Sequence, residues 1–218
     1  MPEDSIPKKR PFLVTFEGID GCGKTTILSH VTDYCQSKSI PYKTIAEKHH
    51  PLIQSKIFNS DKLPSFQLQL LYWWQTRREL LEENYLFNEF EDLNVVFFDR
   101  YYDSTYAYQY LTTGSIESKF NFNSSIFPTP NLTFYLQLDQ ATALDRLVDR
   151  NSNDFYEKLD SLKYIDQYNN LYTSQKCDRE YNYNHTIEII DVSLSENTVA
   201  EIVISKFKRQ YFNYAMHV

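Results

Sequence analysis

The stretch Gly18-Ile19-Asp20-Gly21-Cys22-Gly23-Lys24-Thr25 decides how this chain folds. It matches the pattern G-x-x-x-x-G-K-[ST], in which glycines let successive backbone N–H groups turn inward around a phosphate. A short apolar run, residues 12–16, precedes the stretch, and apolar residues at helical spacing follow Lys24. A strand, a glycine loop and a helix in this order indicate a phosphate-binding loop, or P-loop. We therefore predict a nucleoside triphosphate site in which Lys24 reaches the β- and γ-phosphates.

Short apolar runs alternate with segments of helical periodicity along the rest of the chain. This alternation predicts an α/β protein with the three-layer P-loop NTPase fold, in which helices flank a parallel central sheet of about five strands. One domain is expected over residues 12–218, after a flexible N-terminal arm over residues 1–11. The expected strands are 12–16, 42–45, 95–98, 132–138 and 186–190, and the expected helices begin near residues 24, 64, 104, 141, 154 and 195.

A polar pair follows one of these strands. Asp99 and Arg100 come directly after the apolar run 95–98. Because parallel sheets bind ligands at the carboxyl ends of their strands, both residues are expected near the P-loop. Asp99 is placed like the second acidic residue of P-loop enzymes, which orients Mg²⁺ together with the Thr25 hydroxyl, and the planar guanidinium of Arg100 suits a phosphate. The alternatives are an ordinary strand-end carboxylate and a surface ion pair.

The composition excludes several classes of protein. The chain has 218 residues, of which 42% are hydrophobic and 23% charged, as in a folded domain. Its net charge of −7 argues against binding to duplex nucleic acid. Cys22, Cys35 and Cys177 have no metal-site or disulfide spacing, no secretory signal is visible, and no apolar run approaches the ~18 residues of a membrane span. We expect a cytoplasmic protein with small-molecule substrates and no nucleic-acid or membrane partner.

Three segments together resemble the thymidylate kinase family. The first is the P-loop with its flanks, residues 16–26. The second is Asp99-Arg100-Tyr101-Tyr102-Asp103-Ser104-Thr105-Tyr106-Ala107-Tyr108-Gln109, which is similar to the family signature DR(Y/H)xxSxxAYQ. The third is Pro130-Asn131-Leu132-Thr133-Phe134-Tyr135-Leu136, which resembles the strand P-D-L-T-x-Y-L before the family's lid. The resemblance extends from about residue 12 to residue 172, and it implies a homodimer that transfers the γ-phosphoryl group of ATP to dTMP with Mg²⁺.

The resemblance implies a role for each matching residue of the dTMP site. Trp73 would stack on thymine, and Arg77, one helical turn later, would reach the base edge. Arg100 would hold the monophosphate, and the Tyr108 ring would crowd the 2′ position of the sugar. Trp74 is expected in the core instead, and the pair His49-His50 in a loop. The residues that the resemblance places around dTMP are Asp20, Lys48, Trp73, Arg77, Arg100, Ser104, Thr105, Tyr108 and Gln109.

The sequence departs from the family in the helical lid, which is expected at about residues 150–158. The family pattern D-R-(I/Y)-E corresponds to Asp154-Phe155-Tyr156-Glu157, so Phe155 replaces the lid arginine. Because an arginine on the transferred phosphate is worth ~10³–10⁵ in rate, we expect Arg150 or Arg146 to substitute. The catalytic residues would then be Lys24, Asp99, Arg100 and Arg150, with Thr25 and Asp99 at the metal. The contacts to ATP would come from Gly18, Asp20, Gly21, Cys22, Gly23, Lys24, Thr25, Thr26 and Arg146.

Three other functions stay open on the sequence. One is a related P-loop kinase that acts on another deoxynucleotide or on a deoxynucleoside, although Trp73, Arg77 and the segment 104–109 favour thymine. Another is a degenerate kinase fold retained as a nucleotide-binding module, for which Phe155 is the argument. The third is a nucleotide-dependent switch, but the chain lacks the motif Asn-Lys-x-Asp with which GTPases read guanine.

Overall fold

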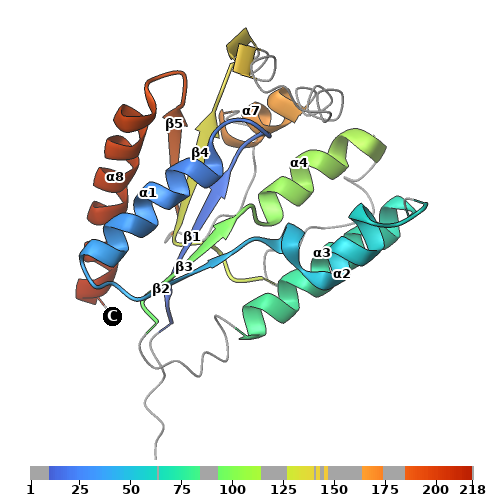
Figure 1. Ribbon diagram of the computed structural model, residues 1–218, viewed down its shortest axis with the longest axis horizontal. Coiled ribbons are helices and arrows are strands. Elements are labelled where there is room, and N and C mark those ends of the chain that lie inside the picture. Colours follow the sequence, from blue (N-terminus) through green and yellow to red (C-terminus); the bar gives the residue numbers. More distant parts are fainter. Residues whose placement is uncertain are drawn as a thin grey trace, which may run out of the picture.

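One parallel sheet forms the centre of the protein (Figure 1). The computed structural model describes residues 10–62, 64–83, 93–113, 127–139, 141–142, 145–146, 164–173 and 185–217. The described strands pair in parallel, and their order in the sheet is β2-β3-β1-β4-β5. The predicted parallel sheet of about five strands is therefore confirmed. Its strands are β1 (Phe12–Glu17), β2 (Tyr42–Ile45), β3 (Val95–Asp99), β4 (Leu132–Gln137) and β5 (Thr186–Asp191).

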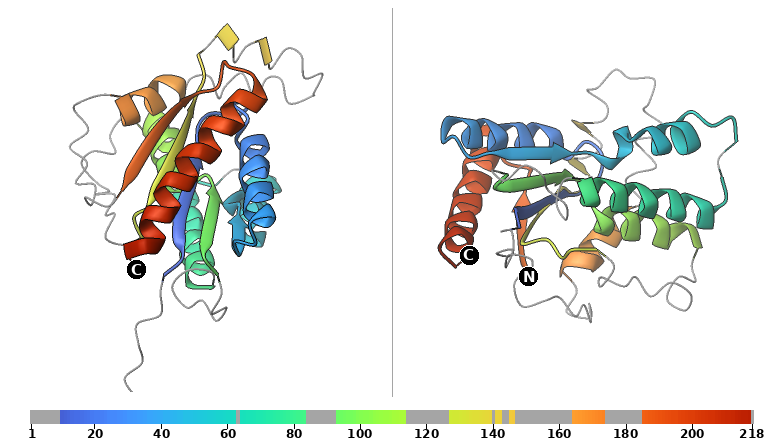
Figure 2. Two further views of the ribbon diagram at one scale, coloured as in Figure 1. Left: turned by 90° about the vertical axis from the view of Figure 1, so that its left-hand side faces the viewer. Right: turned by 90° about the horizontal axis from the view of Figure 1, so that it is seen from below.

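Helices cover both faces of the sheet, which gives the predicted three layers (Figure 2). Helices α1 and α8 pack together on one face, and α3 and α4 lie on the other. Helix α7 packs beside α4. The bounds of these helices are Lys24–Ser37 for α1, Phe66–Leu81 for α3, Tyr102–Thr113 for α4, Ile165–Thr173 for α7 and Glu196–His217 for α8.

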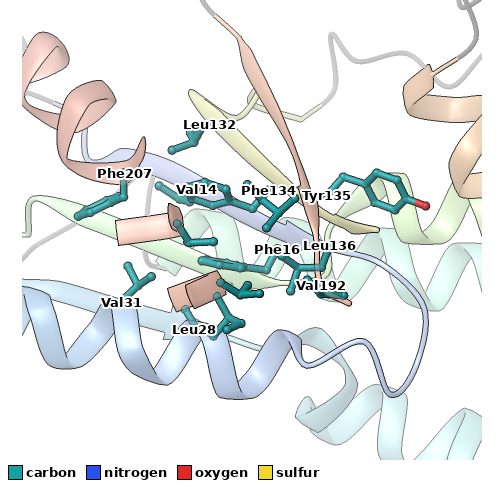
Figure 3. Packing of buried hydrophobic residues seen from close by; sticks show 14 of the residues in the cluster. Val14, Phe16, Leu28, Val31, Leu132, Phe134, Tyr135, Leu136, Val192 and Phe207 are labelled. Atoms are coloured by element: carbon teal, nitrogen blue, oxygen red, sulfur yellow. The ribbon is translucent and has the colours of Figure 1, made fainter. Parts of the chain in front are cut away.

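The apolar run of β1 is explained by burial on both sides. All six residues of this strand are buried, because a central strand of a parallel sheet has helices over each face. Val14 and Phe16 point towards α1 and α8, where they meet Leu28 and Phe207 (Figure 3). Leu13 points to the opposite face and joins the second core cluster, beneath α3 and α4.

Most of the expected boundaries hold, and two differ. The helix expected near Ser104 begins at Tyr102, because Glu17 of the neighbouring strand already accepts a hydrogen bond from the Tyr101 amide at 2.8 Å. The segment expected to be a loop after β2 contains helical turns, which are η1 (Glu47–His49), α2 (Pro51–Ile53) and η2 (Gln54–Phe58). Turns this short carry no periodic signal in the sequence.

Most of the N-terminal arm, the lid, most of the helix expected from residue 141 and the first part of the helix expected from residue 154 fall outside the described residues. The structure describes only residues 10 and 11 of the predicted N-terminal arm, and none of the predicted lid at 150–158. Among the helices that the structure describes, none combines the length and the apolar character needed to cross a membrane.

We predict that Phe207 carries much of the packing between α8 and the sheet. Its ring is fully buried and lies 5.6 Å from the Phe97 ring and 6.3 Å from the Phe12 ring. Phe207→Ala should lower the free energy of unfolding by about 3–5 kcal/mol, through the lost transfer energy and the cavity. Phe212→Ala is the matched control on the same helix, since this ring is 51% exposed, and should cost less than about 1 kcal/mol. Equal losses in urea denaturation would contradict the packing argument.

Candidate active site

The P-loop joins the end of β1 to the start of α1, and its conformation requires glycine. Gly18, Gly21 and Gly23 have φ values of +141°, +82° and +94°. Residues that carry a Cβ rarely adopt such values. A Cβ on Gly18 would also lie 2.7 Å from the Leu136 carbonyl oxygen. The loop therefore keeps its backbone N–H groups in the turn that a phosphate needs, at the N-terminus of α1.

Lys24 folds back over this loop. Its ammonium group donates to the carbonyl oxygens of Gly18 at 3.0 Å and Ile19 at 2.7 Å, and the side chain is buried. Burial lowers the pKa of Lys24, and the positive charge of Arg100 lowers it further. Cys22 is buried beneath the same amine, with its sulfur 3.7 Å from Nζ. The amine is thus held at the place where phosphate oxygens would compete with the carbonyl groups for its protons.

Thr25 and Asp99, the two residues predicted to hold magnesium, are in contact. The Thr25 hydroxyl donates to Asp99 Oδ2 at 3.2 Å across the ends of α1 and β3. A hydroxyl and a carboxylate are oxygen ligands that suit Mg²⁺, which takes its remaining ligands from water and substrate phosphates. Within the described ranges, no group of three or more His, Cys, Asp or Glu side chains is placed to hold a metal by protein ligands alone. The oxygen atoms of Thr25 and Asp99 are therefore ligands of the kind that the predicted Mg²⁺ would bind.

Arg100 links the P-loop to the start of α4. Its guanidinium pairs with Asp20 Oδ1 at 2.6 Å, and its Nη1 donates to the hydroxyls of Ser104 at 3.1 Å and Tyr168 at 3.0 Å. The same group lies 5.0 Å from the centre of the Tyr108 ring. Burial opposes ionisation of Asp20, but the charges of Arg100 and Lys24 outweigh it and lower the pKa of this carboxyl. Arg100 also has a positive φ of 71°, an unusual conformation for a residue with a side chain.

A pocket of about 550 Å³ opens beside Arg100. It takes side chains from the P-loop, from the carboxyl end of β3, from α3 and α4, and from the turns after β2. Seven residues of the predicted dTMP site share this pocket, which are Asp20, Lys48, Trp73, Arg100, Ser104, Thr105 and Tyr108. The other residues that line it are Glu47, Ile57, Phe58, Gln69, Asp99, Tyr101 and Tyr164. Trp74 lies instead against the second core cluster, as expected.

Arg77 lies behind the pocket wall rather than on it. Its side chain is fully buried, and its Nε and Nη2 donate to the two oxygens of Glu47 at 2.6 and 2.7 Å. Nη2 also donates to the Thr105 hydroxyl at 2.8 Å. Nη1 is buried and has no hydrogen-bond partner among the described residues. The pair with Glu47 was not predicted from the sequence, and it occupies most of the guanidinium that is expected to reach the base.

Several residues predicted for the ATP and dTMP sites lie outside this pocket or outside the residues that the structure describes. Thr26 is exposed on α1, and the Arg146 guanidinium donates to the Val192 carbonyl oxygen at 2.5 Å. Gln109 is described as part of the α4 backbone only, and Arg150 and Phe155 lie outside the described residues. The functions predicted for these residues therefore stay predictions.

Five residues in or beside the site were not predicted from the sequence, which are Glu17, Glu47, Gln69, Tyr164 and Tyr168. Glu17 and Glu47 follow apolar strand residues just as Asp99 does, so the signal that singled out Asp99 was present for them too. Tyr164 packs against Tyr108 with ring centres 4.3 Å apart and the ring planes tilted by 40°, but nothing in the sequence distinguishes it among eighteen tyrosines.

Glu17 is a fully buried acid beside this site. Its Oε1 accepts from the Tyr101 amide at 2.8 Å, and its Oε2 lies 2.5 Å from the Ser104 hydroxyl oxygen. Burial, aided by the negative charge of Asp103, raises the pKa of Glu17 to about 8. At neutral pH the carboxyl therefore holds its proton in the folded protein.

Comparison with known proteins relates the chain to one family. A family model described as "Thymidylate kinase" matches residues 16–202. A "Probable thymidylate kinase" of Archaeoglobus fulgidus is 31% identical over 193 residues, which cover 88% of this chain and 92% of that protein. A "Probable thymidylate kinase 1" of Saccharolobus solfataricus is 28% identical, with 92% and 98% covered. A "Thymidylate kinase" of Leptospira borgpetersenii is 31% identical, with 75% and 80% covered.

We predict that Glu17 makes folding stability depend on pH. The folded protein keeps this proton up to about pH 8, whereas a glutamate in the unfolded chain loses it near 4.5. Between these values the folded state binds one proton more, so rising pH lowers stability by up to about 1.4 kcal/mol per unit. Relative to Glu17→Gln, the wild type should therefore lose stability between pH 5 and pH 8 in urea denaturation. A constant difference between the two proteins would show that Glu17 ionises normally.

Proposed function

Because the chain belongs to the thymidylate kinase family, we propose that it transfers the γ-phosphoryl group of ATP to dTMP and releases ADP and dTDP. The P-loop would bind the donor, and the pocket beside Arg100 would bind the acceptor. Both substrates are polyanions, and a protein of net charge −7 can bind them because its local cations face the two subsites. Lys24, Lys48 and Arg100 are those cations.

The ion pair between Asp20 and Arg100 is the observation that carries this proposal. Asp20 belongs to the P-loop, and Arg100 lines the pocket that also contains Trp73. The donor and acceptor subsites are therefore adjacent, as transfer between two bound phosphates requires. An indole of the size of Trp73 gives a flat base a surface for stacking, and Tyr108 narrows the same pocket where it packs over Arg100.

Catalysis would rest on position and charge. Phosphoryl transfer needs no covalent intermediate on the protein, so the residues have to orient the two phosphates and stabilise the negative charge that moves between them. Lys24 would hold the β- and γ-phosphates, and Arg100 would hold the acceptor phosphate in line with them. Mg²⁺ held by Thr25 and Asp99 would neutralise charge on the donor phosphates when bound.

The lid arginine, the homodimer and the cytoplasmic location stay predictions. Arg146 is one of the described residues that precede the expected lid, and it donates to the Val192 carbonyl oxygen. Leu68 and Leu71 of α3 are 39% and 53% exposed, which supports an apolar contact between two copies on this side of the sheet.

The function can be tested by coupled ADP release with a panel of dTMP, dUMP, dCMP, dAMP and thymidine. We expect dTMP to give a kcat/KM at least about tenfold above dCMP and dAMP, because buried polar groups reject a wrong base edge strongly. Thymidine should also react at least about tenfold less well, because it lacks the phosphate that Arg100 would hold. Lys24→Met should lower kcat about 10²–10³-fold by removing one charged donor from the transferred phosphate. A preference for another acceptor would reassign the substrate. Absence of turnover in the wild type would favour a binding module.

Trp73→Ala should weaken binding of dTMP by about 1–3 kcal/mol, which is the range for stacking of a base on an aromatic ring. KM for ATP should change little, because Trp73 lines only the acceptor pocket. Trp73→Phe is the matched control, since it keeps a ring for stacking and should retain most of the affinity. An equal rise of both KM values, or unfolding of Trp73→Ala alone, would assign the indole to the core.

A further inference from the structure

Glu17 is a buried acid to which the proposed reaction gives no task. It is the last residue of β1, directly before Gly18 of the P-loop, and its side chain is fully buried. It does not line the acceptor pocket, although Tyr101 and Ser104, which contact it, both do. A buried carboxyl costs folding free energy, so its position calls for a physical explanation.

Both contacts of Glu17 lie at the start of α4. Tyr101 directly precedes the helix, and Ser104 stands in its first turn. One carboxyl group therefore contacts a backbone N–H and a hydroxyl at a helix N-terminus, as a capping side chain does. The acid here comes from a distant strand, so it fixes the helix end relative to β1 and to the loop that follows β1.

The Ser104 hydroxyl carries this restraint on to Arg100. Ser104 Oγ contacts Glu17 Oε2 at 2.5 Å and accepts from Arg100 Nη1 at 3.1 Å. The Tyr168 hydroxyl oxygen lies 2.6 Å from Ser104 Oγ and accepts a hydrogen bond from Arg100 Nη1 at 3.0 Å. With Ser104 and Tyr168 fixed, the guanidinium has one preferred orientation, in which Nη2 faces Asp20 of the P-loop.

We propose that Glu17 is a positioning residue of the acceptor site, which orients Arg100 through the Ser104 hydroxyl and the Tyr101 amide. Glu17 itself touches no substrate. It holds the arginine in the orientation that receives the acceptor phosphate, and because it adjoins Gly18 it ties this orientation to the P-loop. This inference rests on the proposed function, since it assigns Arg100 to the acceptor phosphate.

Burial and the neighbouring charges determine whether the Glu17 carboxyl is protonated. The charged and titratable groups that face it are Asp103 and Arg100 at the start of α4, Arg77 from α3 and Tyr168 from α7. Burial and Asp103 together raise the pKa of Glu17 to about 8. A neutral carboxyl leaves the charge of Arg100 available for a phosphate, whereas an ionised one would compete with the phosphate for it.

Two substitutions of similar size separate hydrogen bonding from packing. Glu17→Gln keeps an oxygen for the Tyr101 amide and a polar group for Ser104, whereas Glu17→Met fills the space and keeps neither contact. In steady-state assays at pH 7, Glu17→Met should raise KM for dTMP about tenfold or more and change KM for ATP less than about twofold. Glu17→Gln should show at most about a fifth of that rise in KM for dTMP. Equal behaviour of the two variants, or an equal rise of both KM values, overturns the proposal.

A pH profile tests the same idea if Glu17→Met does not fold. Between pH 7 and pH 9 the KM of the wild type for dTMP should rise as Glu17 ionises beside Arg100. Over the same range the KM of Glu17→Gln for dTMP should rise much less. Parallel profiles of the two proteins overturn the proposal. A wild type that turns over no dTMP refutes the proposed function instead, and normal wild-type turnover with parallel profiles refutes only the role of Glu17.

Discussion

A single backbone hydrogen bond aligns the two halves of the active site. The Arg100 amide donates to the Phe16 carbonyl oxygen at 3.0 Å, in a register that sets Phe16 of β1 opposite Asp99 of β3. Because β1 and β3 are parallel neighbours, their carboxyl ends lie at one level of the sheet. The P-loop and the start of α4 therefore begin side by side. Every longer contact of the site, including the pair of Asp20 with Arg100, depends on that alignment.

The electrostatics of the site follow from its depth. Lys24 and Arg77 are buried cations, and each is bound by oxygen groups, Lys24 by loop carbonyls and Arg77 by Glu47. Such pairs lose hydration and are tolerated because the hydrogen bonding is close to complete. Arg77 Nη1 is an exception among the described residues, and an unpaired buried donor costs free energy. The arrangement suits anionic and carbonyl-bearing ligands.

The sequence was sufficient for the sheet, because its strands are apolar runs buried on both faces and its P-loop has a fixed pattern of glycines. It also brought Trp73, Arg100 and Tyr108 to one pocket, since strand ends and helical spacing determine where side chains gather. The sequence did not predict contacts between residues that lie far apart along the chain. The pair of Glu47 with Arg77 joins a turn after β2 to α3, thirty residues apart, and the short turns after β2 have no periodicity. No local pattern encodes such contacts.

At Arg100 the left-handed backbone conformation lowers stability, whereas the side chain at the same position is proposed to serve activity. A residue with a Cβ at φ 71° stores about 1–3 kcal/mol of strain, which glycine would relieve. Glycine would also remove the guanidinium that joins Asp20, Ser104 and Tyr168. Engineering that ranks substitutions by backbone fit alone would therefore discard the cation that we propose for the acceptor site. Any programme to raise the melting temperature of this protein should hold Arg100 fixed and take its gains from positions remote from the P-loop.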